Sequence, residues 1–169
     1  LFGDTNLGGG LIDELILSGA MAASRDQKAL EAVFEESPAW RSYCELEARR
    51  LKESYFLDEE KWAEAPLCRT LTVCYDEPLA LELSIGGASI RKMVEQPIPA
   101  LGGRSFVGCL KDALCAAVEV SRSCPPEVVI LTGGASRMAF FQQACREAFA
   151  DALVVLCPEP ECSIARGLA

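Results

Sequence analysis

An apolar run that stops at a pair of glycines constrains the fold of this chain more than any other segment. Residues 127–137 read Glu-Val-Val-Ile-Leu-Thr-Gly-Gly-Ala-Ser-Arg, and an amphipathic helix is predicted after them. The aliphatic residues 128–131 are typical of a strand covered on both faces. Gly133 and Gly134 remove every side chain at its carboxyl end, where ligands collect in open α/β sheets. The glycines therefore indicate either a floor for a base or phosphate, or only a tight turn with positive φ.

Periodicity, prolines and glycines predict the other elements of the chain. The predicted elements are a helix that follows Gly8, Gly9 and Gly10, helices over 26–36 and 38–56 separated at Ser37-Pro38, a hairpin of strands over 68–75 and 79–85, helices over 88–96 and 105–123, and a strand over 154–156. In the helix over 105–123 we interpret one apolar stripe as core, made of Val107, Leu110, Leu114, Ala117 and Val118. This order of helices and strands indicates an α/β fold.

The charge and hydropathy of the chain exclude several classes of protein. With 169 residues, 50% of them hydrophobic, and a formal net charge of −9, the chain is typical of an acidic globular domain. An acidic chain is a poor ligand for nucleic acids and anionic membranes, which need clustered Lys and Arg. No apolar run approaches the roughly 20 residues that span a bilayer, and no signal sequence opens the chain, so we expect a cytoplasmic protein.

The nine cysteines indicate neither a disulfide scaffold nor a metal site. The chain has no C-x-x-C pair and no histidine, which removes the usual zinc patterns and histidine-based acid-base chemistry. Most of the cysteines fall at apolar positions, and we expect them to be free thiols that act as small core residues. Only Cys157 and Cys162 lie close enough in one loop to be considered as a disulfide pair.

Three motifs, in order along the chain, resemble the DnaK-type heat shock protein 70 family. Residues 133–138, Gly-Gly-Ala-Ser-Arg-Met, resemble its adenosine motif, in which a strand ends in Gly-Gly-Ser-Thr-Arg before a helix. Residues 3–9, Gly-Asp-Thr-Asn-Leu-Gly-Gly, resemble the family's Gly-Asp-Thr-His-Leu-Gly-Gly, and Ile12 and Asp13 follow as an apolar residue and an aspartate do there. Residues 163–169, Ser-Ile-Ala-Arg-Gly-Leu-Ala, resemble the closing helix of the family's ATPase domain.

This resemblance implies the second lobe of an actin-like ATPase (ribonuclease H-like) domain, an α/β fold with an inserted α+β subdomain. Residues 1–24 would begin the inner subdomain, 25–100 would form the outer subdomain, and 101–169 would complete the inner one with the adenosine motif. Because the chain lacks an initiator methionine and ends inside a helical pattern, we expect a piece of a longer protein. Its inner sheet would then have an exposed edge, through which dimerisation is a further expectation.

The resemblance also implies a set of nucleotide-binding residues. They are Gly8, Gly9, Gly10, Arg49, Lys52, Gly133, Gly134, Ala135 and Arg137. Gly10 stands where the family usually has a glutamate, which puts a hydrogen bond to the ribose in doubt. Arg49 and Lys52 follow from aligning Leu51 and Tyr55 with the inward positions of the family's Glu-x-Ala-Lys-x-x-Leu-Ser helix. An earlier register gives Glu47, Arg50 and Ser54 instead, and without the resemblance the charges of this helix indicate a solvated face.

The phosphate loops of the family are absent from this sequence, so we expect no catalytic residue and no catalysis by this chain alone. The expected cofactor is ATP or ADP, with magnesium in the longer parent. The parent, a chaperone, would bring a nucleotide exchange factor and client proteins as partners. Two other functions stay open: a binding or interaction module on the same fold that no longer holds nucleotide, and another actin-like ATPase, such as a sugar kinase or a cell-shape protein.

Overall fold

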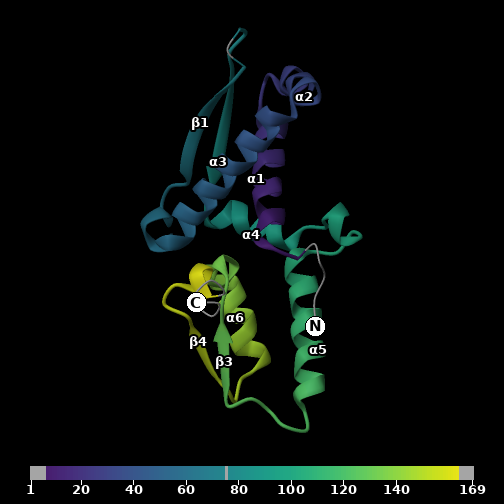
Figure 1. Cartoon of the computed structure of the whole chain (residues 1–169), viewed down its shortest axis with the longest axis vertical. Coiled ribbons are helices and arrows are strands. Elements are labelled where there is room, and N and C mark those ends of the chain that lie inside the picture. Colours follow the sequence, from purple (N-terminus) through teal and green to yellow (C-terminus); the bar gives the residue numbers. More distant parts are fainter. Residues whose placement is uncertain (1–6, 75, 164–169) are drawn as a thin grey trace. The chain divides into compact units, whose positions relative to one another are not determined.

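The computed structural model describes residues 7–74 and 76–163, which form a mixed α/β protein with several helices and two small sheets (Figure 1). Each of these sheets has two strands. The chain divides into two compact units, one of Gly10–Met93 and one of Leu1–Gly9 with Val94–Ala169. The expected division at 24/25 and 100/101, and the actin-like fold itself, stay predictions.

The unit Gly10–Met93 begins with three helices: α1 (Gly9–Ala23), α2 (Gln27–Glu36) and α3 (Pro38–Leu57). Pro38 occupies the first turn of α3, where its missing amide hydrogen costs no hydrogen bond, so α2 ends and α3 begins at the predicted break. In α1 the residues Leu11, Ile12 and Ile16 are buried at helical spacing; Leu15 is only half-buried, and Leu17 is buried in addition.

A hairpin completes the core of this unit. Strands β1 (Leu67–Val73) and β2 (Leu79–Ile85) pair antiparallel, with Leu71 opposite Leu81. Both strands contact α3 (Figure 1). One face of the hairpin is apolar and buried. Burying one such leucine or valine side chain stabilises the fold by roughly 1.5–3 kcal/mol. The 3-10 turn η1 (Glu59–Trp62) leads into the hairpin, and helix α4 (Gly87–Glu95) follows it.

The other unit contains a βαβ arrangement. Strand β3 (Val128–Leu131) leads through the 3-10 turn η3 (Gly134–Arg137) and helix α6 (Ala139–Ala148) to strand β4 (Leu153–Leu156), which is parallel to β3 (Figure 1). Helix α5 (Phe106–Ser121) precedes them and packs against α6. The turns η2 (Pro99–Leu101) and η4 (Pro160–Cys162) flank these elements. The Ser105 hydroxyl caps α5 by accepting a hydrogen bond from the Gly108 amide at 3.0 Å.

The prediction that the strand over 128–131 is covered on both faces is wrong within the described residues. Val128 and Ile130 are 49% and 66% exposed, while Leu131 is buried. In the parallel register Val128 lies opposite Leu153 and Ile130 opposite Val155, and these two partners are exposed as well. The continuous apolar run therefore has one buried side, and the sheet has one uncovered apolar face.

Two smaller predictions about the core need correction. On α5 only Leu110 of the predicted stripe is fully buried, and Phe106 and Cys109 complete the buried side, because the helix buries its first turns more deeply than its last. The cysteines are also less buried than their apolar neighbours indicate. All nine lie in the described ranges as free thiols, of which only Cys44, Cys109 and Cys145 are buried.

Candidate nucleotide site

The glycine turn after β3 is held by backbone hydrogen bonds. Gly133 has φ 80° and ψ 151°, a conformation that side chains with a Cβ rarely adopt, so this position requires glycine. Its amide donates to the Pro160 carbonyl at 2.7 Å, and its carbonyl accepts from the Ser136 amide at 3.0 Å and the Ser136 hydroxyl at 2.7 Å. The tight-turn explanation is therefore sufficient for Gly133.

Gly134 is different, because its backbone does not require glycine. A Cβ added at Gly134 would meet no atom within 4 Å, and its φ lies outside the positive range. The residue is exposed, and Ala135 after it is half-buried. The absent side chain of Gly134 thus leaves open space over the backbone at the end of β3, as a flat ligand there would need.

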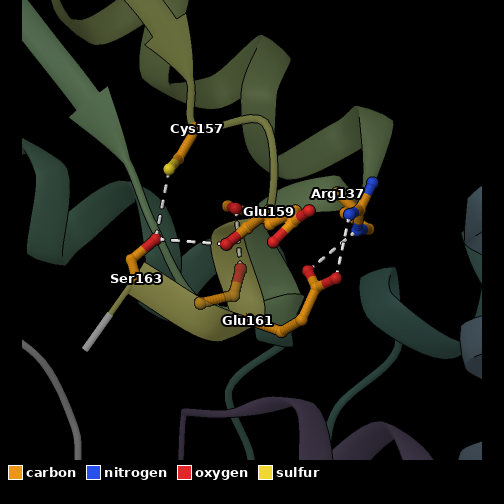
Figure 2. Close-up of polar contacts among 7 residues, drawn as sticks. Arg137, Cys157, Glu159, Glu161 and Ser163 are labelled. Carbon is orange, nitrogen blue, oxygen red and sulfur yellow. Dashed lines mark hydrogen bonds and ion pairs between the residues drawn. The ribbon is translucent and has the colours of Figure 1, made fainter. Parts of the chain in front are cut away.

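Arg137 ends the same turn and is bound by a carboxylate from elsewhere in the chain. Its Nε donates to Glu161 Oε2 at 3.1 Å and its Nη2 to Glu161 Oε1 at 3.0 Å, as Figure 2 shows. The side chains of Arg137 and Glu161 are 25% and 50% exposed. The hydrogen bonds from Arg137 hold the pKa of Glu161 below its usual range, so the carboxylate is ionised at neutral pH.

The turn that carries Glu161 has its own set of bonds (Figure 2). Pro160 in this turn is buried, and its carbonyl is the acceptor for Gly133. The Ser163 hydroxyl lies within hydrogen-bond distance of two acceptors, Cys157 Sγ at 3.2 Å and the Glu159 carbonyl at 3.4 Å. The hydrogen bond from the Gly133 amide to the Pro160 carbonyl therefore joins the segment after β4 to the glycine turn after β3, directly beside Glu161.

The glycines at the start of the chain lie at the beginning of α1. The helix starts at Gly9, and Gly8 precedes it. A Cβ added at Gly8 or Gly10 would meet no atom within 4 Å. The structure thus gives this stretch the helix N-terminus that the sequence predicts, and residues 3–6 of the motif lie outside the described residues.

The two predicted cations of α3 are both paired within the chain. Arg49 is an exposed partner of Glu53, with 2.9 Å between Nε and Oε1, and Glu53 holds the pKa of Arg49 above its usual range. Lys52 is buried, and its Nζ lies 2.6 Å from Oδ1 of Asp13 in α1. Burial raises the pKa of Asp13, and Lys52 offsets that rise only in part. Leu51 and Tyr55 are buried, as the chosen register requires.

The alternative register contains a second buried carboxylate. Glu47 accepts hydrogen bonds from Arg69 of β1 and from Arg50, both at 2.5 Å. Burial alone would raise the pKa of Glu47, but these two guanidinium groups hold it below its usual range. Ser54 donates to the Arg50 carbonyl at 2.8 Å. Glu47 therefore ties α3 to the hairpin, a structural role that explains its burial without a ligand.

The predicted set is divided between the two units. Gly133, Gly134, Ala135 and Arg137 form one turn, and Gly8 and Gly9 belong to the same unit. Gly10, Arg49 and Lys52 belong to the other unit. Sequence reasoning missed Glu161, for which the acidic loop around Pro160 was the only signal, and it missed Asp13 as the partner of Lys52. An aspartate among the apolar residues of α1 was a signal for that pair, because a buried charge needs a partner.

A separate hollow of about 670 Å³ lies on the unit Gly10–Met93. Small side chains line much of it, among them Gly19 and Ala23 at the end of α1, Thr70 of β1 and Ser84 of β2. It contains none of the predicted nucleotide-binding residues.

Comparison with models of known families, with curated proteins and with solved structures finds no match to this chain. Within residues 7–74 and 76–163 no helix is both long enough and apolar enough to cross a bilayer. The same residues contain no group of three or more Cys, Asp or Glu side chains arranged to hold a metal ion.

Proposed function

We propose that this chain supplies the adenosine side of an ATP or ADP site, on the second lobe of an actin-like ATPase domain of the heat shock protein 70 type. The observation that carries the proposal is the open backbone at Gly134, at the carboxyl end of a parallel strand. A flat base has room on this backbone, and Arg137 adds a guanidinium that stacks on aromatic rings. The resemblance of residues 133–138 to the adenosine motif assigns the base as adenine.

Catalysis would belong to the longer parent rather than to this chain. Phosphoryl transfer depends on positioned contacts to phosphate and magnesium, and the sequence has neither phosphate loop. The parent would be a cytoplasmic chaperone ATPase that loads magnesium with the nucleotide. Its exchange factor and its clients would bind through parts of that protein.

A specific observation favours a second candidate, a binding module that no longer holds nucleotide. Lys52 is buried in an ion pair with Asp13, and Arg49 is paired with Glu53 on the helix surface. A nucleotide that used either cation would have to break a contact within the chain. The binding module therefore remains the rival of the nucleotide site, and binding measurements separate them.

The test is a chemical-shift titration of the chain with adenosine, ADP and ATP. We expect millimolar affinity, corresponding to about 4 kcal/mol, because the base contacts act without contacts to the phosphates. The three ligands should bind almost equally. Shifts should concentrate at residues 133–137.

The matched variants are Gly134→Val and Gly19→Val. A Cβ meets open space at both positions, so neither variant should collide with its surroundings, and inside helix α1 valine has a better helix propensity than the glycine it replaces. We expect Gly134→Val to abolish adenosine binding and Gly19→Val to leave it unchanged. Should the folded Gly134→Val variant bind adenosine as the parent does, the glycine pair is only a turn and the binding module is the better reading.

A further inference from the structure

Glu161 has a position that the resemblance to the nucleotide-binding family does not explain. It comes from the turn after β4, yet its carboxylate faces the guanidinium of Arg137, 24 residues earlier (Figure 2). Two nearly equal hydrogen bonds, donated by Nε and Nη2 to the two carboxylate oxygens, engage one edge of the guanidinium plane. Such a bidentate pair fixes the plane as well as the charge of an arginine.

Backbone hydrogen bonds hold the two turns that carry Arg137 and Glu161 in place. The amide of Gly133 donates to Pro160, the residue before Glu161, so the two turns are joined next to the ion pair. Pro160 is buried, and the Cys162 amide donates to the Glu159 carbonyl at 3.0 Å to close the turn around Glu161. Arg137, the glycine pair and Glu161 therefore form one local assembly within one unit.

The chemistry of this assembly separates two classes of ligand. A phosphate or carboxylate binds arginine in the plane of the guanidinium, through the same kind of edge that Glu161 occupies, and it also meets the negative charge of Glu161. A heterocyclic base stacks on the face of the plane, which an edge-on partner does not cover. Glu161 therefore opposes anions at Arg137 without opposing a neutral ring.

We infer that Glu161 is a positioning residue that excludes anions from Arg137 and orients the guanidinium to stack on a neutral heterocyclic ring. The inference rests on the proposed adenosine site and deepens it, because it explains how an arginine beside a nucleotide selects the base instead of the phosphates. A nucleotide would then enter with its base toward the glycine turn.

The test uses adenosine and inorganic phosphate as separate probes of the parent chain and of Glu161→Gln. The substitution keeps the shape of the side chain, removes its charge and turns one acceptor oxygen into a donor. We expect phosphate affinity to rise by about tenfold, since the competing carboxylate is gone, and adenosine affinity to fall by about threefold. A purely structural role for Glu161 would move both affinities in the same direction.

The control is Glu147→Gln, which removes the same charge from helix α6 of the same unit, where Glu147 accepts a hydrogen bond from Gln143 at 2.8 Å. It should leave the preference for adenosine over phosphate unchanged. If the turn is intact in Glu161→Gln, the amide signal of Gly133 should keep its chemical shift. If that signal shifts, Glu161→Asp is measured instead, because it retains the negative charge and should retain the exclusion of phosphate.

The phosphate measurement decides the inference in every case. If Glu161→Gln binds phosphate no better than the parent, Glu161 does not exclude anions and the inference fails. If the parent binds no adenosine, the proposed function fails on its own measurement, while a gain in phosphate binding would still assign the exclusion of anions to Glu161.

Discussion

Replacing Lys52 by methionine tests how strongly the buried ion pair holds α1 to α3. The side chains of Lys52 and Asp13 are only 9% and 11% exposed, and their charged atoms lie 2.6 Å apart. At an effective dielectric constant of about 20, two unit charges at that distance attract by about 6 kcal/mol. The desolvation of both ions offsets much of this attraction in the parent. In Lys52→Met the attraction is lost, whereas the cost of burying Asp13 remains.

We therefore expect Lys52→Met to lower the free energy of unfolding at pH 7 by about 3–5 kcal/mol. A domain of this size is typically stable by about 5–15 kcal/mol, so the loss is a large share. The double variant Asp13→Asn, Lys52→Met should recover at least half of it, because neither of these two positions then carries a buried charge.

The loss should also depend on pH in a stated direction. The folded pKa of Asp13 lies above its ordinary value of 3.8 already in the parent, and removing Lys52 raises it further. A group of this kind favours the folded state below its unfolded pKa, and this contribution disappears as the pH rises through the folded pKa. The difference between parent and Lys52→Met should therefore shrink as the pH falls from 7 toward 4.

The assay is urea unfolding followed by far-ultraviolet circular dichroism, with equal m-values as a check that the unfolding reaction is the same. The control is Arg41→Met, which removes an exposed pair between the same two helices, with 3.6 Å between Arg41 Nη2 and Glu14 Oε1, together with the exposed pair of Arg41 and Glu45 within α3. Exposed pairs contribute about 0–1 kcal/mol, so this change should have little effect. A loss below 1 kcal/mol for Lys52→Met, or no recovery in the double variant, would refute the reasoning.

Further predictions concern other parts of the chain. The lowered folded pKa of Glu47 means that its carboxylate contributes stability above about pH 4.5, and that this contribution is lost as the pH falls through the folded pKa. Glu47→Gln should therefore destabilise the fold more at pH 7 than at pH 3, and urea unfolding at both pH values checks this. Cys44 should react last with a thiol reagent, since burial raises its pKa to about 11, and the exposed Cys115 should react early. In denaturant all nine thiols should react with the reagent. Ser105→Ala should cost about 1 kcal/mol in thermal or urea unfolding through loss of the cap on α5. Because the sequence has no phosphate loop, ATP hydrolysis by this chain should stay at background. Hydrolysis that follows the protein through an added purification step would contradict this prediction.

Local features of the fold could be predicted from the sequence, because neighbouring residues determine them. Pro38 sets the boundary between α2 and α3, and the alternation around Pro78 gives the hairpin. Gly133 after an apolar run gives the turn. These signals act within a few residues, where helix geometry, strand alternation and backbone sterics leave few alternatives.

Pairs between distant residues could not be predicted in the same way. Glu47 meets Arg69 and Arg137 meets Glu161 only because elements far apart in sequence are packed together. On sequence alone, Glu47 belongs to a charged helix face that looks solvated. The glycines and Arg137 of the candidate site were proposed from the sequence and stay a prediction, while the carboxylate that binds Arg137 was found only in the structure.

The uncovered face of the β3–β4 sheet has a consequence for handling and redesigning the chain. Val128, Ile130, Leu153 and Val155 already meet solvent, so they contribute little of the hydrophobic free energy that holds this unit folded. Threonine keeps the branched shape that strands favour and adds a hydroxyl. Threonine at these four positions should therefore improve solubility at a small thermodynamic cost, which makes this face a suitable surface for redesign.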